Sequence, residues 1–583
     1  MSQGVSQKAM AQFVAQFTPS PDASESNPIP PEFTIPDFGT DPDQLPPPDL
    51  LPLPLIEDLL RPSDLSPPVQ EDATVDELRV TVNRIEFEGN TVFSDEELNT
   101  VIPDGILGEA VTITQLYDIR TAVTAKYLDA GYATSGAFLP EQPIRDGMVT
   151  IQVVEGTLTR IDIRGNEKLQ DSYVANRIRR DIDEDTPLNV NDLLDTLRLL
   201  QLDPRIETLA AELGGGINLG DSILTVDVVE GDAFDVVFSL DNGRSPSVGS
   251  FRQSVELRTL NFNGHGETFS FAYSRTRGSN AFDGRISTFL NARDGKLELR
   301  GGISDSQVVE EPFDESIELE SQAHFVELTY RQPIVQTLNE EFALGITASH
   351  QQNRSTLTFL GVPEGFGGSN PFTIFGADED GIVRVSALRF FQEWNRRRSR
   401  DVFAARSQLS IGLDAFDSTV NSDGRPDSRF VAWRGQAQWA RLLAEDTLLL
   451  LKTDVQFADN DLLTLEQFGL GGQSSIRGYR QDILLTDNGV LGSAEFRYPL
   501  ARVRRVNGVL HLIPFLDVGH GWNLGDDDPD PQTLVGAGLA LQWQQNDLTA
   551  RIDVGFPLVD VDTRDDDSLQ EMGIHLSLEW TAF

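Results

Sequence analysis

From Asp232 to the end of the chain, short runs of alternating apolar and polar residues follow one another without an intervening helical pattern. In residues 269–274, for example, aromatic residues alternate with small ones. Successive side chains of a β-strand point to opposite faces, so each run predicts a strand with one apolar and one polar face. We expect residues 232–583 to form a transmembrane antiparallel β-barrel of about 16 strands, with lipid outside and water inside.

A soluble β-sandwich would show the same alternation, so the periodicity alone leaves both architectures open. Aromatic residues beside predicted turns, such as Tyr330 and Tyr498, favour the barrel, because these side chains gather at membrane interfaces. The longer polar inserts at 363–380 and 417–427 fit extracellular loops. The chain lacks a run of about 18 uncharged apolar residues, so a transmembrane helix is not expected.

An internal repeat of about 75 residues precedes the predicted barrel. The sequence R-I-E-F-E-G-N at 84–90 is echoed by R-I-D-I-R-G-N at 160–166, and V-V-E-G at 153–156 is repeated at 228–231. Each copy predicts the order strand, helix, helix, strand, strand, which is a small α+β module. We expect the first module over residues 80–156 and the second over residues 157–231.

Helix signals are clear in the first copy. Ser94 and Glu97 form the pattern of a capping box at the start of a short helix, and Thr112 or Thr114 begins a longer one. Gly131 is expected to end the longer helix. The residues expected to face the core from that helix are Leu116, Ile119, Val123, Tyr127 and Leu128.

The remaining elements of the modules follow from the same patterns. In the first copy, strands are expected around 132–138 and over Met148–Val154. In the second copy, Asn189 and Asn191 open the longer helix, since an asparagine side chain caps free backbone N–H groups. The residues expected to pack inward from it are Leu194, Leu197 and Leu200.

Residues 1–79 differ in amino-acid composition from the rest of the chain. Residues 18–79 are rich in Pro and Asp and predict an extended linker. Before them, apolar residues at helical spacing in 5–17 predict a short amphipathic helix. This stretch lacks the basic and apolar regions of a secretory signal peptide, so we expect the export signal to lie upstream.

Composition argues against several function classes. The formal net charge of −46 makes nucleic acid an improbable partner, because phosphate binding depends on Lys and Arg. The chain has no cysteine and only six scattered histidines, which argues against disulfides and zinc sites. Motifs of hydrolases and nucleotide-binding proteins are missing. The sequence therefore predicts a protein that is not an enzyme and has no cofactor or metal.

Two short motifs near the C-terminus combine charge with glycine. Residues 469–479, G-L-G-G-Q-S-S-I-R-G-Y, place Arg477 in a flexible loop, and residues 515–519, F-L-D-V-G, place Asp517 in a strand. A guanidinium can bind a carboxylate through two parallel hydrogen bonds. Gly519 lies on the same face as Asp517 and leaves room for another backbone. The alternative is a surface turn with a solvated arginine.

In order and spacing these motifs resemble the signature of the outer-membrane barrel-assembly superfamily, whose sixth extracellular loop folds back into the barrel. The resemblance implies that Arg477 binds Asp517 inside the lumen. It also implies that the repeated modules are POTRA domains, which stand in the periplasm. The motif residues are Ile476, Arg477, Gly478 and Tyr479 in the loop and Phe515, Asp517 and Gly519 on the inner wall.

Two POTRA-like modules followed by a barrel resemble the two-partner secretion transporters, the TpsB family, over roughly residues 80–583. The resemblance implies a monomeric outer-membrane pore that exports one large β-helical exoprotein of the TpsA type. The predicted helix at 5–17 would then be a candidate plug of the barrel, and an unstructured segment is the alternative. Other implied partners are outer-membrane lipid and the barrel-assembly machinery. The alternatives are a barrel-assembly insertase and a porin or adhesin.

An exposed strand at the edge of a POTRA sheet can add an extended polypeptide as a new strand. This predicts that the modules capture unfolded cargo, while a rigid spacer without cargo contact is the alternative. The residues expected to bind cargo are Tyr132, Phe138, Val149, Ile151 and Val153.

The chain ends in a strand that closes on Phe583, as outer-membrane barrels do. Phe583 does not share the parity of the apolar positions up to Trp580. We therefore expect a bulge or a frayed end after Trp580.

Overall fold

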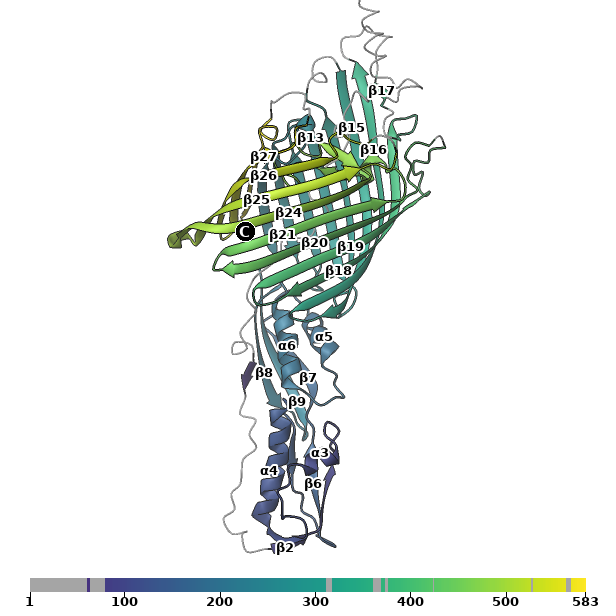
Figure 1. The fold of residues 1–583 in the computed structure, drawn as a ribbon. Coiled ribbons are helices and arrows are strands. Elements are labelled where there is room, and N and C mark those ends of the chain that lie inside the picture. Colours follow the sequence, from purple (N-terminus) through teal and green to yellow (C-terminus); the bar gives the residue numbers. More distant parts are fainter. Residues whose placement is uncertain are drawn as a thin grey trace, which may run out of the picture.

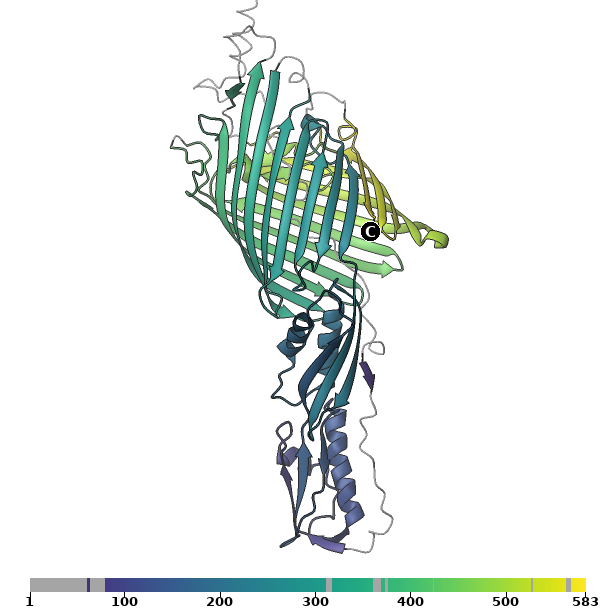
Figure 2. The same cartoon turned by 180° about the vertical axis from the view of Figure 1, so that it is seen from behind.

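The structure is a computed structural model that describes residues 60–62, 79–310, 317–359, 369–372, 376–422, 424–525, 528–561 and 568–582. The predicted helix at 5–17, most of the linker and Phe583 lie outside the described residues. Figures 1 and 2 show two small modules stacked in a column at one end of a large barrel. Among the helices that are described, none has the length and apolar character needed to cross a membrane.

The first module is a three-stranded sheet with two helices. β3 (Arg84–Glu88) runs parallel to the central strand β6 (Met148–Val154), and β5 (Gly136–Phe138) pairs with the other side of β6 in antiparallel orientation. The predicted strand at 132–138 is therefore shorter, because residues 132–135 form a turn. The other elements are β2 (Arg79–Val82), α3 (Asp95–Asn99), β4 (Glu109–Thr112) and α4 (Ile113–Asp129).

The helix ends of this module follow the sequence signals. Ser94 and Glu97 make the predicted capping box, and Thr112 caps α4. At the other end of α4, Gly131 has a φ of 92° and its N–H bonds to the carbonyl of residue 128. The prediction for Leu128 was wrong. Its side chain is 49% exposed, because it lies about 100° around the helix from the buried Tyr127.

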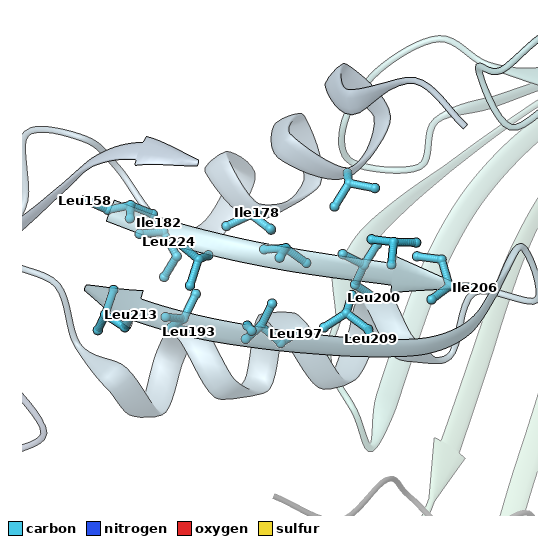
Figure 3. Packing of buried hydrophobic residues seen from close by; sticks show 14 of the residues in the cluster. Leu158, Ile178, Ile182, Leu193, Leu197, Leu200, Ile206, Leu209, Leu213 and Leu224 are labelled. Carbon is cyan, nitrogen blue, oxygen red and sulfur yellow. The ribbon is translucent and has the colours of Figure 1, made fainter. Parts of the chain in front are cut away.

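The second module repeats this architecture. Its elements are β7 (Thr157–Arg164), α5 (Asp171–Asp181), α6 (Val190–Gln201), β8 (Ile206–Gly215) and β9 (Asp221–Glu230). Figure 3 shows leucines of α6 pointing at the two long strands β8 and β9. Asn189 caps α6 as predicted. Leu197 and Leu200 are buried as predicted, whereas Leu193, rather than the predicted Leu194, is the fully buried residue at the start of that face.

The repeated V-V-E-G motif has the same role in both modules. The Glu155 carboxylate accepts hydrogen bonds from the N–H groups of residues 91–92, at 2.7 and 2.9 Å, and from the Tyr127 hydroxyl at 2.6 Å. Glu230 accepts hydrogen bonds from the N–H groups of residues 167–169, at 2.7, 2.8 and 2.6 Å. Each glutamate therefore ties the last strand of its module to the turn after the first strand.

Sixteen of the described strands form a closed antiparallel barrel, which confirms the predicted fold. Each strand pairs with its neighbours along the chain, and the first and last strands pair to close the barrel. The short strand β17 (Ser369–Pro371) only extends the edge of β16. The sixteen strands are β10 (Phe234–Asp241), β11 (Arg252–Leu260), β12 (Thr268–Arg275), β13 (Ser279–Phe289), β14 (Lys296–Gln307), β15 (Ile317–Gln336), β16 (Glu340–Phe359), β18 (Ile382–Arg397), β19 (Asp401–Leu413), β20 (Val431–Ala444), β21 (Thr447–Ala458), β24 (Asn488–Val503), β25 (Gly508–Trp522), β26 (Thr533–Gln545), β27 (Leu548–Pro557) and β28 (Ile574–Thr581).

The barrel strands are apolar outside and polar inside. Arg300, for example, is buried on the lumen side, where its Nε lies 2.9 Å from Oδ2 of Asp283. This distribution suits a barrel surrounded by lipid that encloses water. Large apolar side chains exposed on the outer face include Phe238, Leu257, Phe271, Phe282, Leu299, Ile303, Leu328, Ile346, Phe390, Leu409, Leu451, Leu516, Leu541 and Ile552.

The two ends of the barrel differ in their connections. Short turns such as 337–339 and 398–400 lie at the end that contacts the second module, where Arg177 Nη2 is 2.7 Å from Asp294 Oδ1. The described parts of the predicted inserts at 363–380 and 417–427 lie in connections at the opposite end. Outer-membrane barrels have short periplasmic turns and longer extracellular loops, so the modules lie on the periplasmic side.

The last strand contradicts one expectation. β28 pairs with β10 in regular register from Ser577 to Thr581, and the N–H of Ala582 still donates to the carbonyl of Val236. Within the described residues the predicted bulge or fray after Trp580 was therefore wrong. The Trp580 ring instead stacks on Phe238 across the closing pair, with ring centroids 5.7 Å apart.

Glu155→Gln should destabilise the first module. Burial alone would raise the pKa of Glu155, but the hydrogen bonds from Thr91, Tyr127 and Val92 hold it below the ordinary 4.5. The stabilisation is therefore complete above the pKa of the unfolded chain and is lost as the pH falls through the lower pKa of the folded state. Loss of the charge should cost about 1–2 kcal/mol at neutral pH.

Hydrogen exchange of residues 84–154 in the full-length protein measures this loss. The matched control is Glu141→Gln, which changes an exposed glutamate of the same module. Equal protection of the Glu155→Gln variant and the natural chain at neutral pH would contradict the role of Glu155.

Candidate functional site: the lumen loop

The connection between β21 and β24, residues 459–487, folds back into the barrel, and we call it the lumen loop. It contains a hairpin of β22 (Phe468–Leu470) and β23 (Leu484–Thr486), whose tip carries the I-R-G-Y motif. Ile476 and Tyr479 are buried at this tip. They belong to an apolar cluster with wall residues Leu491 and Leu534, so the loop packs against the inner wall.

Arg477 lies against Asp517 of β25, as the motifs predicted. Arg477 Nε is 2.8 Å from Asp517 Oδ2, and Nη2 is 2.8 Å from Oδ1, which makes the paired hydrogen bonds of a fork. The backbone N–H of Arg477 also donates to Asp517 Oδ2 at 3.2 Å. Asp517 is fully buried and Arg477 is only 4% exposed, so the two charges are removed from water together.

Two further carboxylates, which the sequence analysis did not identify, complete this site. Arg477 Nη1 lies 2.5 Å from Glu495 Oε1 on β24 and 3.2 Å from Asp553 Oδ1 on β27. Arg551 Nη2 bridges the same two groups, at 2.9 and 2.6 Å. The sequence signal that could have identified the two carboxylates is a charged residue at an inward-facing position of each strand. Arg477 therefore joins three barrel strands.

The other residues of the wall motif also touch the loop. The Arg477 guanidinium lies 3.7 Å from the centre of the Phe515 ring, which is cation–π geometry. A Cβ at Gly519 would lie 2.4 Å from Ile476 Cδ1, so the missing side chain makes room for the loop. The motif F-x-D-x-G thus supplies a ring, a carboxylate and a gap on one face of β25.

Glycines on two neighbouring strands let the loop backbone approach, and the sequence analysis missed them. A Cβ at Gly536 of β26 would lie 2.0 Å from the Arg477 carbonyl oxygen, and one at Gly555 of β27 would lie 2.6 Å from the Gly478 nitrogen. Gly478 itself has a φ of 104°, which other residues rarely adopt. Beside these wall glycines, the Tyr479 hydroxyl lies 3.0 Å from the Val535 carbonyl oxygen.

The proposed cargo-binding residues divide into two groups. Val149, Ile151 and Val153 are buried in the core of the first module, and their strand β6 is the centre of its sheet. They cannot meet cargo without unfolding the module, so that part of the prediction was wrong. Tyr132 is half-buried against Tyr127. Phe138 remains available, because it is 38% exposed on the edge strand β5.

The edge of the second module is partly occupied by the chain itself. β1 (Leu60–Pro62) pairs in parallel with residues 211–213 of β8, so the sheet order is β1-β8-β9-β7. The expectation of a free edge in each module therefore fails for this part of β8. The linker composition gave no strand pattern that would have predicted the pairing.

Known families match this chain in its modules and in its barrel. The ShlB-type POTRA domain family matches residues 80–156, and the family of haemolysin secretion/activation proteins ShlB/FhaC/HecB matches residues 383–543, the part of the barrel that carries the lumen loop. Over these two stretches the chain is similar to the ShlB/FhaC/HecB proteins. It is thus an outer-membrane transporter with periplasmic POTRA modules, which secretes a partner protein, and it is not an enzyme.

Individual relatives of the ShlB/FhaC/HecB type match over most of the chain. The heme/hemopexin transporter protein HuxB of Haemophilus influenzae is 22% identical over 75% of this chain and 76% of its own length. The outer membrane transporter CdiB of Escherichia coli is 23% identical over 85% of this chain and 82% of its own length.

Solved structures agree on the fold. CdiB from Escherichia coli superposes with a TM-score of 0.63 at 20% identity, covering 90% of this chain and 94% of that one. BamA from Haemophilus ducreyi lacking POTRA domains 1–3 gives a TM-score of 0.50 at 16% identity, covering 86% of this chain and 100% of that one.

Exchanging the charges of Arg477 and Asp517 should not restore the docked loop. In the double variant Arg477→Asp, Asp517→Arg, the new carboxylate would face Glu495 and Asp553, and like charges at this distance repel. Truncating one partner of such a buried pair costs about 3–5 kcal/mol. We therefore expect protease to cleave the loop at 471–483 as readily as in the single variant Arg477→Asp.

Limited proteolysis of the purified protein in detergent gives the readout. Arg477→Lys, which keeps the charge but loses the fork, serves as the control and should show intermediate protection. A double variant as resistant as the natural chain would show that Asp517 is the only partner that matters.

Proposed function

We propose that this chain exports one large secreted partner protein across the outer membrane through its barrel and works as a monomer. The observation that carries the proposal is the lumen loop, which a buried arginine holds against three strands of the inner wall. A loop fixed in this way obstructs the lumen, so the resting pore is closed. Transport then requires a rearrangement of the loop to open a path.

The first module is the best candidate for cargo capture. Its edge strand β5 lies beside α4, and Ala137 donates its N–H to Thr124 Oγ1 at 3.0 Å. Tyr117 and Leu128 lie on the same face of α4 as Thr124, and both are exposed. An extended cargo segment would add to β5 by displacing the Thr124 hydroxyl and would cover these apolar side chains and Phe138.

The driving force would come from the cargo. The sequence carries no P-loop motif, which argues against nucleotide hydrolysis as the energy source. A cargo that folds into a β-helix outside the cell would be drawn outward, because the folded part cannot return through the pore. The apolar outer face of the strands would contact outer-membrane lipid, and the barrel-assembly machinery would insert the barrel. Nucleic acid is not expected to bind this acidic chain.

Phe138→Asp should lower secretion without lowering the amount of inserted barrel. The new carboxylate would stand at the β5 edge, where it disfavours an added apolar strand. We expect secretion to fall about tenfold, which corresponds to roughly 1.4 kcal/mol of lost binding. Immunoblots of the medium and of outer membranes give the two quantities.

Leu107→Asp is the matched control, since it changes another exposed apolar residue of the same module outside β5 and α4. Equal secretion by the Phe138→Asp and Leu107→Asp variants would contradict capture at β5.

Deleting the protein should remove one large protein from the medium and leave other outer-membrane barrels unchanged. Quantitative proteomics of medium and outer membranes compares cells with and without the chain. Broad depletion of many barrels would point to an assembly insertase instead, and a defect in solute uptake with normal secretion would point to a porin.

A further inference from the structure

A second set of contacts holds the lumen loop directly after the I-R-G-Y motif. Arg480 Nη1 lies 3.1 Å from Glu571 Oε1, and Arg480 Nη2 lies 3.1 Å from Glu310 Oε2. The backbone N–H of Gln481 donates to Gln570 Oε1 at 2.8 Å. Gln570 and Glu571 belong to the connection between β27 and β28. The loop is therefore also attached to the extracellular end of the barrel.

The contacts with Gln570 and Glu571 are shielded from water, whereas the Glu310 side chain is 28% exposed. Gln570 has no exposed surface, and the side chains of Glu571 and Arg480 are 3% and 8% exposed. A buried polar group that loses its partner leaves an unsatisfied donor or acceptor. The structure therefore favours keeping all of these contacts or breaking them together.

The amide nitrogen of Gln570 contacts the connection that follows β10, the first strand of the barrel. Its Nε2 donates to the carbonyl oxygens of Asn242 and Arg244, the latter at 2.7 Å, in the connection after β10. Asn242 in turn donates to the Ile574 carbonyl at 2.9 Å and accepts from the Leu576 N–H at 2.6 Å. The side-chain amides of Gln570 and Asn242 together thus link the lumen loop to both sides of the pair β10–β28.

The pair β10–β28, which we call the closing seam, has the shortest strand ladder among the sixteen described barrel strands. β10 and β28 share five residue pairs, Val237–Asp241 with Thr581–Ser577. The next shortest ladder among the sixteen described barrel strands is β27–β28, with seven. Contacts at the extracellular end of such a short ladder make up a large share of what keeps it closed.

We propose that Gln570, Glu571 and Arg480 form a second dock that couples the lumen loop to the closing seam. Gln570 and Arg480 are positioning residues, because they act through the loop and the seam. Release of the loop removes a partner from Gln570 and loosens the seam, and a loosened seam weakens the hold on the loop. The importance of this coupling for transport rests on the proposed function, in which the loop must move to let a large cargo pass.

Hydrogen exchange of the purified full-length protein in detergent tests the coupling without any cargo. The main variant is Arg480→Ala, since the ion pairs of Arg480 with Glu571 and Glu310 lie outside β10 and β28. We expect the amides of 237–242 and 576–581 to exchange about tenfold faster, together with those of 471–483. Glu571→Gln, which keeps the size of the side chain, should shift both sets in the same direction and serves if Arg480→Ala does not insert.

Arg300→Ala is the matched control, because it removes an equally buried lumen arginine that pairs with Asp283 on neighbouring strands. It should leave exchange at the seam unchanged. Faster exchange in the loop with unchanged exchange at the seam would overturn the proposal, as would equal effects of Arg480→Ala and Arg300→Ala at the seam. Since no cargo is present, this result is independent of whether the chain secretes a partner.

Discussion

A guanidinium buried inside a barrel must be neutralised where it stands, and this requirement fixes the centre of the molecule. Arg477 pairs with Asp517, Glu495 and Asp553, which lie on three different strands, and Arg551 shares the last two carboxylates. The geometry holds only if β24, β25 and β27 keep their register and the loop backbone comes close to the wall. Gly536 and Gly555 make that approach possible.

The remaining parts of the chain place this site between two compartments. Alternating strands give an outer face for lipid and an inner face where charged groups pair, so an ionic dock can exist within the membrane. The two modules stand at the short-turn end of the barrel, joined to it by contacts such as Arg177 with Asp294. The module proposed to capture cargo and the docked lumen loop then lie along one route through the molecule.

Sequence reasoning predicted the contacts that depend on local order and missed those that depend on register. Asp517 could be paired with Arg477 because parity, loop glycine content and the resemblance to a known family all pointed to it. Glu495 and Asp553 could not, since their approach follows from which residues of neighbouring strands lie opposite each other.

The modules illustrate the same limit. The capping signals at Ser94 and Thr112 were readable because they act within four residues. Val149, Ile151 and Val153 were assigned to cargo because an alternating strand does not reveal whether it is central or at the edge. Leu194 was predicted to face the core in place of Leu193. Which of these two neighbouring leucines points inward depends on how α6 packs against β8 and β9.

The most direct measurement of the central claim is secretion by the Arg477→Ala variant at matched levels of inserted barrel. The account predicts that the barrel still inserts, because its strands and closing pair remain, while the amount of partner protein in the medium falls. Normal secretion by that variant at a normal level of inserted barrel would contradict the claim that the buried arginine dock is the feature on which transport depends.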